Sequence, residues 1–264
     1  MDTGTRIPAV AGTFYPGTAP ALGAAVDALL REARPVAPEP CPKALIVPHA
    51  GYVYSGPIAA TAFARLAPYA ERIERVVLVG PAHRVFVHGL ASPGAGWLRT
   101  PLGDVEVDAA ALAEVPAIHA DAAAHAREHC LEVELPFLQR VTPRAKVVPV
   151  LASRLPPAQV GAVLEALWGG PETVIVVSTD LSHYLPYRAG RTRDQRTVDR
   201  ILDGELDLDG EDACGAVAVN GLTWVARRRR MRIELLDLRS SGDTAGSRDE
   251  VVGYAALALY EVAS

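Results

Sequence analysis

The sequence has few cysteines and no long uninterrupted apolar segment. Its 264 residues include three cysteines, an odd number that is too small for a disulfide framework and indicates a reducing compartment. No segment approaches the ~20 consecutive apolar residues of a membrane-spanning helix, so no association with a membrane is expected. The first residues also lack the basic and apolar stretches of a secretion signal. We therefore expect a cytoplasmic protein.

The chain also lacks an excess of positive charge. It carries 26 Lys and Arg against 31 Asp and Glu, a net charge of −5, so no overall field attracts nucleic acid. A hydrophobic content of 50% with 22% charged residues is typical of an ordinary globular protein. No internal repeat, low-complexity tract or long linker divides the chain, and we expect a single domain over residues 1–264.

Short apolar runs alternate with helical patterns along the chain. Six runs predict buried strands: Ala44–Val47, Arg75–Val79, Lys146–Leu151, Thr173–Val177, Arg232–Leu238 and Val251–Tyr260. Apolar spacings of three and four predict helices at Ala19–Arg34, Gly56–Leu66, Ala109–Val115, Glu132–Arg140, Pro157–Leu167, Arg191–Leu202 and Asp212–Arg230. This alternation predicts an α/β fold, with a mixed and mainly parallel sheet flanked by helices.

Two segments mark boundaries between these elements. Ser55-Gly56-Pro57 offers a capping hydroxyl and a first-turn proline at the start of the expected Gly56–Leu66 helix. Ser240–Ser247 is rich in Gly and Ser and predicts a loop between the last two strands. We expect this loop at the surface or over a pocket.

Three predicted strands end in polar clusters that each contain a histidine: His49, His83 and His183. A single histidine after a strand is usually structural. Three at equivalent positions indicate a metal or acid–base site, because ligands bind at the carboxyl ends of strands in open α/β sheets. We expect the three imidazoles to share one pocket. Ser178, Asp180 and His183 do not predict a hydrolase triad, since they crowd one loop and no Gly-x-Ser-x-Gly elbow is present.

Cys214 lies near the start of the expected Asp212–Arg230 helix. There the positive end of the helix dipole favours a thiolate, so Cys214 is expected to have the lowest pKa of the three thiols and could ligate a metal. Alternatively, it is a small residue packed within an Ala- and Val-rich helix. The residues alone leave both interpretations open.

The acidic segment Glu128–Glu134 opens another expected helix. Its carboxylates could simply compensate the helix dipole. Alternatively, Glu132 or His129 faces the pocket, as a base or as a partner that orients a ligand histidine. Asp180 is expected on a loop rather than in the core, so that Asp180→Asn should impair chemistry or metal affinity much more than folding.

An ordered series of motifs across nearly the whole chain resembles the Memo family, in its bacterial AmmeMemoRadiSam system protein B form. The resemblance is carried by Arg6–Pro16, Val47–Tyr52, Gly80–His83, His129–Phe137, Ser178–His183, Cys214-Gly215 and Ser241–Gly246.

This resemblance implies a fold similar to the class III extradiol dioxygenases, which are non-haem iron enzymes that cleave catechol rings. The positions that match His49, His83 and Cys214 are associated with metal in the family, and those that match Asp180 and His183 line the same pocket. Ferrous iron (Fe2+) is the implied metal, with zinc or copper as alternatives. Bacterial members are often encoded beside a radical-SAM protein and an Ammecr-like protein, while the animal namesake is linked to receptor-driven cell motility.

The implied third ligand is a thiolate, whereas ring-cleaving enzymes use two histidines and a carboxylate. Dioxygenase activity therefore does not transfer directly. The first hypothesis is an oxidoreductase with redox or oxygenase-type activity on an unknown small molecule, in which Asp180 and His183 transfer protons. A zinc-type hydrolase would use Asp180 or Glu132 as base. A non-catalytic binding module would use the same cleft.

Overall fold

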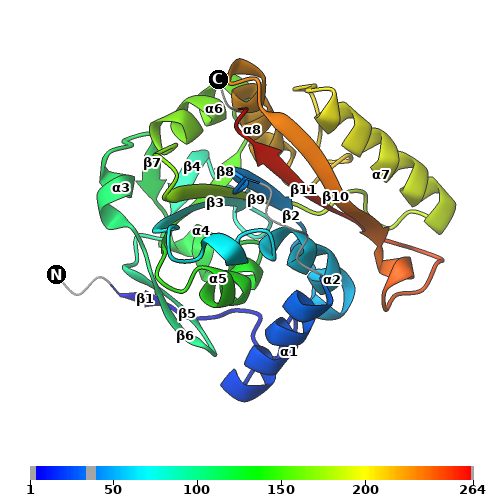
Figure 1. Ribbon diagram of the computed structural model, residues 1–264, viewed down its shortest axis with the longest axis horizontal. Coiled ribbons are helices and arrows are strands. Elements are labelled where there is room, and N and C mark those ends of the chain that lie inside the picture. Colours follow the sequence, from blue (N-terminus) through cyan, green and yellow to red (C-terminus); the bar gives the residue numbers. More distant parts are fainter. Residues whose placement is uncertain (1–3, 34–39, 263–264) are drawn as a thin grey trace.

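The computed structural model describes residues 4–33 and 40–262. Within them, the centre of the molecule is a mixed sheet that agrees with the α/β prediction (Figure 1). From one edge to the other its strands are β10 (Arg232–Ser240), β11 (Gly253–Tyr260), β2 (Ala44–Val47), β9 (Thr173–Ser178), β3 (Arg75–Pro81), β8 (Lys146–Ser153), β4 (Gly89–Ser92) and β7 (Ile118–Ala120).

The four central strands β2, β9, β3 and β8 run parallel. Antiparallel pairs lie at the two sides, where β11 joins β2 and β4 joins β8. Because parallel strands end on the same side, the loops after β2, β9 and β3 gather at one edge of the sheet. This edge is where the sequence places its histidine clusters.

Both faces of the sheet are buried, so the central strands are apolar on both sides. In β2, Leu45 and Val47 pack into one core while Ala44 and Ile46 pack into the other. Successive side chains of a strand point to opposite faces, which explains this division. The short continuous apolar runs of the sequence are therefore strands between two layers of helices.

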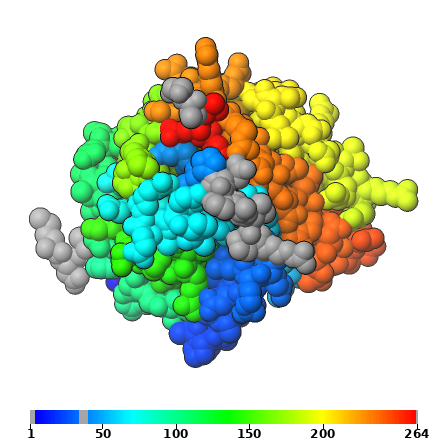
Figure 2. All heavy atoms as spheres, in the orientation of Figure 1, coloured from blue at the N-terminus to red at the C-terminus, as the bar shows by residue number. Residues whose placement is uncertain are grey.

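Helices cover each face of the sheet (Figure 1). The first core includes side chains from α1 (Ala19–Glu32), α2 (Tyr52–Phe63), α4 (Ala122–Ala126) and α5 (Leu135–Val141). The second includes side chains from α3 (Ala109–Ala113), α6 (Pro157–Ala166), α7 (Tyr187–Leu202) and α8 (Ala216–Arg228). In the space-filling view, α1 lies at the lower edge of the molecule and α7 at the right (Figure 2).

A second, small sheet was not predicted. It contains β1 (Thr5–Arg6), β5 (Trp97–Thr100) and β6 (Gly103–Glu106), with β1 parallel to β5 and β6 antiparallel to β5. Strands this short are below the length at which a periodic pattern is recognisable. This sheet attaches the N-terminal segment to the body of the protein.

The predicted start of α2 is wrong. The helix begins earlier, at Tyr52, so that Pro57 lies inside it and Ser55 donates its hydroxyl to the Ala50 carbonyl, 2.9 Å away, instead of capping. The reason is tertiary: the Tyr52 N–H donates to the carbonyl of Phe14 at 2.7 Å. The Phe14 carbonyl, far from Tyr52 in the chain, thus accepts the helix N–H that a nearby capping side chain would otherwise accept.

The other predicted boundaries are mostly close. The six predicted strands agree with the structure to within two residues at each end. The expected Asp212–Arg230 helix is shorter, since α8 begins at Ala216 with Gly215 as its cap. Arg34, the expected end of the first helix, lies outside the described residues. In residues 4–33 and 40–262, no helix has both the length and the hydrophobicity needed to span a bilayer.

Candidate metal centre

The carboxyl ends of β2, β3 and β9 open into one pocket. It has a volume of about 670 Å³, and its lining includes His49, His83, Asp180 and His183. Each of these residues follows one of the three strands, which are neighbours in the sheet. The structure therefore brings the three strand-end histidines of the sequence to the same cavity.

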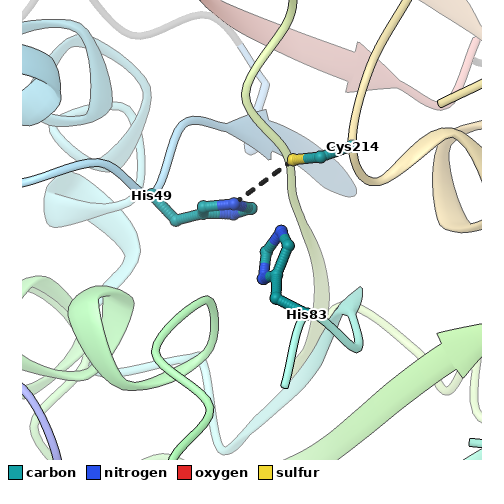
Figure 3. Close-up of side chains that lie close together, drawn as sticks. All are labelled: His49, His83 and Cys214. Atoms are coloured by element: carbon teal, nitrogen blue, oxygen red, sulfur yellow. Dashed lines mark hydrogen bonds between the residues drawn. The ribbon is translucent and has the colours of Figure 1, made fainter. Parts of the chain in front are cut away.

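His49, His83 and Cys214 form a group of possible metal ligands in this region (Figure 3). One nitrogen or sulfur atom from each lies within 4.8 Å of the others. The Nε2 atom of His49 is 3.3 Å from Cys214 Sγ, and the two imidazole centroids are 5.2 Å apart. Metal–ligand bonds of about 2.0–2.3 Å place tetrahedral ligands roughly 3.5 Å apart, so small adjustments would let the group hold one ion.

The ring of His49 is oriented by the end of β9. Its Nδ1 atom lies 2.7 Å from Ser178 Oγ, and its backbone N–H donates to Asp180 Oδ1 at 2.8 Å. These contacts leave Nε2 facing Cys214. Burial, together with the nearby His83 and His129, lowers the pKa of His49 well below its usual value. The imidazole is therefore neutral at pH 7, the form that binds a metal.

The ring of His83 is oriented by Glu128. One oxygen of this carboxylate accepts the His83 backbone N–H at 2.6 Å, and the other lies 2.9 Å from His83 Nδ1. Glu128 also accepts the backbone N–H groups of His129 and Cys130. Burial opposes ionisation of Glu128, but hydrogen bonds from His129 and His83 outweigh it and lower its pKa. An ionised carboxylate behind a ligand histidine fixes its tautomer and increases its basicity.

Cys214 reaches the site because α8 approaches the end of β9 very closely. The Gly215 N–H donates to Thr179 Oγ1 at 2.8 Å, and the Asp180 N–H points at Cys214 Sγ from 3.3 Å. A Cβ atom on Gly215 would lie 2.7 Å from the Ser178 carbonyl oxygen. Only glycine therefore allows this approach, which brings Cys214 Sγ to 3.3 Å from His49 Nε2.

The expected low pKa of Cys214 is contradicted for the metal-free protein. Burial, reinforced by the charge of Asp180, raises the pKa of the thiol to about 12. Cys214 also precedes the Gly215 cap and is not a residue of the helix itself. Desolvation outweighs the helix dipole, so ionisation of this thiol at neutral pH requires a cation beside it.

Asp180 lies deeper than expected. Its carboxylate is buried rather than exposed on a loop, and it accepts the backbone N–H groups of His49 and Ala50. Burial raises its pKa to about 7 although these hydrogen bonds act in the opposite direction. His183 is partly buried in the wall of the same pocket, and burial lowers its pKa. Both residues face the pocket, outside the three-residue donor group.

Glu132 does not line this pocket. Its carboxylate accepts the N–H groups of Ala9 and Val10 at 2.7 and 3.0 Å and the hydroxyl of Tyr15 at 2.6 Å, and it pairs with Arg6. All of these partners belong to the N-terminal segment. The proposed role of Glu132 as a base is therefore replaced by a structural one.

His129 is a pocket residue whose role the sequence left open. Its ring centroid lies 5.4 Å from that of His49 and 4.9 Å from that of His83. Its Nδ1 atom is 3.2 Å from Glu128 Oε1, within ion-pair distance. His83, Glu128 and His129 thus form a second donor group within 4.8 Å. No sequence pattern separates Glu128 from the other acidic residues of this segment.

Aromatic and loop residues form the walls and mouth of the pocket. Tyr54, Tyr184 and Tyr254 line it, and Tyr184 is 70% exposed in a left-handed conformation with φ of 56°. The loop predicted at Ser240–Ser247 lies over the pocket, where Ser241, Gly246 and Ser247 contribute to its lining. The expectation of a loop over the pocket is confirmed.

The fold and this site define an α/β protein with a candidate His/His/Cys metal centre at the carboxyl edge of its sheet. A family model described as Memo-like protein matches residues 6–258. The MEMO1 family protein of Caldivirga maquilingensis is 33% identical over 97% of this chain and 99% of its own. Those of Aquifex aeolicus and Methanopyrus kandleri are 35% and 36% identical, over 94% and 96% of this chain and 97% and 98% of their own. The chain belongs to the Memo family.

Proposed function

We propose that this Memo-family protein binds one metal ion through His49, His83 and Cys214 and uses it in a redox or oxygenase-type reaction. The observation that carries the proposal is the donor group itself, three ligand atoms within 4.8 Å of one another. Both imidazoles are held from behind, by Ser178 and by Glu128. Such support on the far side of each ring is typical of metal-binding histidines.

The proposed metal is ferrous iron, on the resemblance to class III extradiol dioxygenases. A thiolate ligand also suits zinc and copper. When bound, iron would supply one-electron chemistry, whereas zinc would supply Lewis acidity. Cys214 would bind as the thiolate, since a cation offsets the burial that raises its pKa.

Asp180 and His183 are the proposed proton-transfer groups. The pKa of Asp180 is raised to about 7, so its carboxyl can hold or release a proton near neutral pH. His183 lies in the same pocket and is neutral at that pH, because burial lowers its pKa. With Glu132 outside the pocket, a zinc-type hydrolase would depend on Asp180 as its base.

A non-catalytic binding module is the second candidate, and the mouth of the pocket favours it. Val53, Tyr54 and Tyr184 line the pocket with exposed fractions of 67%, 39% and 70%. Exposed apolar side chains around a cleft are typical of binding sites. A radical-SAM protein and an Ammecr-like protein are the proposed partners, and the cytoplasm is the proposed compartment, where the three free cysteines would stay reduced.

Elemental analysis of untagged protein purified under anaerobic conditions tests the proposal. We expect about one metal ion per chain, as for a site with one set of ligands. His49→Ala should lose the metal, whereas His119→Ala, which changes an exposed histidine on β7, should retain it. Oxygen consumption with a reductant would separate redox chemistry from hydrolysis. Protein that carries no metal under any condition would overturn the proposal in favour of the binding module.

A further inference from the structure

Glu134 is a buried carboxyl group beside the metal centre that lies outside the pocket. It ends the 3₁₀ turn Glu132–Glu134 immediately before α5, and only 1% of its surface is exposed. Its Oε1 atom lies 2.9 Å from the hydroxyl oxygen of Ser178. Within the parts of the chain that the structure describes, Glu134 forms no ion pair. A buried carboxylate without a cation is unfavourable, so its protonation state needs an explanation.

The hydroxyl of Ser178 has three close polar neighbours. The Cys130 carbonyl oxygen is 2.8 Å away, Glu134 Oε1 is 2.9 Å away and His49 Nδ1 is 2.7 Å away. A serine hydroxyl supplies one proton and two lone pairs. If all three contacts are hydrogen bonds, the partners must supply two of the three protons.

The identity of the neighbours decides which of them donate. A carbonyl oxygen can only accept, so the Ser178 proton goes to Cys130. The other two contacts then require an N–H at Nδ1 of His49 and an O–H on Glu134. If Glu134 were a carboxylate, the single Ser178 proton could serve only one of the two oxygens, that of Cys130 or that of Glu134. The other oxygen would then lie less than 3 Å from Ser178 Oγ with no proton between them.

We propose that Glu134 is a positioning residue that stays protonated and acts through Ser178 to hold His49 in its Nδ1–H tautomer. The role of His49 as a ligand in this inference rests on the proposed metal centre. In that tautomer the lone pair of His49 is on Nε2, the atom that faces Cys214 at 3.3 Å. Burial independently raises the pKa of Glu134 well above its usual value. A hydroxyl of Ser178 that donated to the carboxylate would lower this pKa, whereas in the proposed arrangement Glu134 is the donor.

The two candidate ligand histidines are therefore supported in different ways. His83 is backed by the ionised carboxylate of Glu128, whereas His49 is backed by a neutral chain of hydroxyl and carboxyl groups. With Cys214 as thiolate, this group and the Glu128 carboxylate carry two negative charges, and Asp180 adds a third only above its pKa of about 7. The two charges match a divalent cation, and an ionised Glu134 would leave an uncompensated buried charge.

Infrared spectroscopy of the metal-free protein at pH 8 tests the proton on Glu134 directly. We expect a carbonyl stretch of a protonated carboxylic acid that disappears in Glu134→Gln. It should persist in Glu106→Gln, which changes an exposed carboxylate paired with Lys146. If the wild type has no carboxylic-acid band that is lost in Glu134→Gln, Glu134 is ionised and the proposal is overturned. This readout does not depend on metal binding.

Zinc affinity, measured by competition with a chelator, tests the action through Ser178. Ser178→Ala and Glu134→Leu should each weaken binding by roughly 10- to 100-fold, as for other groups behind ligand histidines. Glu134→Gln should stay close to the wild type, because its amide N–H can still donate to Ser178. A loss in Glu134→Gln as large as in Ser178→Ala would contradict the proposal.

Nitrogen NMR of His49 completes the test and guards against misfolding. The Nδ1–H tautomer should be present in the wild type and in Glu134→Gln and should be depleted in Ser178→Ala. The other tautomer in the wild type would overturn the proposal, even if Glu134→Leu fails to fold. Wild-type protein that binds no zinc would refute the metal centre, while the infrared and NMR results would still decide the position of the protons.

Discussion

The carboxylate of Asp180 joins the end of β9 to the loop that carries His49. It accepts the backbone N–H groups of His49 and Ala50, and burial raises its pKa to about 7. The folded state therefore holds the Asp180 proton more tightly than the unfolded chain, whose carboxyl has a pKa of about 3.9. Tighter binding of this proton stabilises the folded state. The stabilisation is fully present below the unfolded pKa and is lost as the pH rises through about 7.

Asp180→Asn should remove this pH dependence. Between pH 5 and pH 8 we expect the free energy of unfolding of the metal-free wild type to fall by roughly 3 kcal/mol relative to the variant, at 1.36 kcal/mol per pKa unit. Because the side chain is buried and bonded to His49, we expect the change to affect stability as well as metal affinity. Urea unfolding across the pH range measures it.

Asp249→Asn is the matched control for this experiment, since Asp249 is exposed. Its stability should follow that of the wild type at each pH. Parallel pH profiles for the wild type and Asp180→Asn would show that Asp180 does not hold a proton in the folded state.

Cys214 gives a second prediction at the scale of one residue. Its pKa of about 12 means that the thiol is protonated in the metal-free protein at pH 8, while a metal ligand must be a thiolate. Saturation with zinc at pH 8 should therefore release about one proton per metal ion, and Cys214→Ala should release none at saturation. Titration in weakly buffered solution measures the release.

The choice of pH matters for this measurement, because Asp180 titrates near 7 and would add to the release at lower pH. Equal proton release from Cys214→Ala and the wild type would remove Cys214 from the metal site. A two-histidine site would then need a carboxylate ligand such as Asp180.

At the scale of elements, the position of α8 against β9 decides whether Cys214 can reach the histidines. Gly215 caps the helix and lies against Ser178 and Thr179. An added Cβ would lie 2.7 Å from both the Ser178 carbonyl oxygen and Thr179 Cβ, closer than van der Waals contact allows. The helix would have to move away from the strand.

Gly215→Ala should therefore weaken zinc binding and lower the free energy of unfolding by about 1–3 kcal/mol, the usual cost of overpacking. Calorimetry and chelator competition on the same sample measure both effects. Gly210→Ala is the control, because a Cβ there meets nothing within 4 Å. Unchanged zinc affinity in Gly215→Ala would show that the approach of α8 does not place the third ligand.

At the scale of the whole molecule, the N-terminal segment closes one side of the pocket. Phe14 and Thr13 line the pocket, and the same segment is attached to the body through Glu132, which bonds Ala9, Val10 and Tyr15. Glu132 also forms an ion pair with Arg6, and the side chains of Glu132 and Arg6 are 1% and 9% exposed. Removal of one partner from a buried pair leaves the other charge uncompensated.

Glu132→Ala should lower the free energy of unfolding by about 3–5 kcal/mol. Glu106→Ala, which breaks the exposed pair with Lys146, should lower it by only about 0–1 kcal/mol. Urea unfolding measures both, and zinc affinity of the folded variant should change less than its stability. A variant of normal stability that fails to bind zinc would contradict this structural role and restore Glu132 as a candidate partner of a ligand histidine.

The sequence by itself determined six of the eight strands of the main sheet, all but β4 and β7, and the helices that cover it except α4. It also determined the three histidines that follow strand ends. These features depend on local periodicity and on chain order, which a sequence displays directly. The short strands β1, β5 and β6 and the early start of α2 could not be predicted, because they depend on pairing between distant segments.

Only the tertiary structure decided what each acidic residue of the 128–134 segment does. Glu128 orients His83, Glu132 holds the N-terminal segment, and Glu134 contacts Ser178. The three side chains are chemically identical and lie within seven residues of one another. Their roles differ because the irregular turn before α5 directs them to different partners, and those partners lie 44 to 126 residues away in the chain.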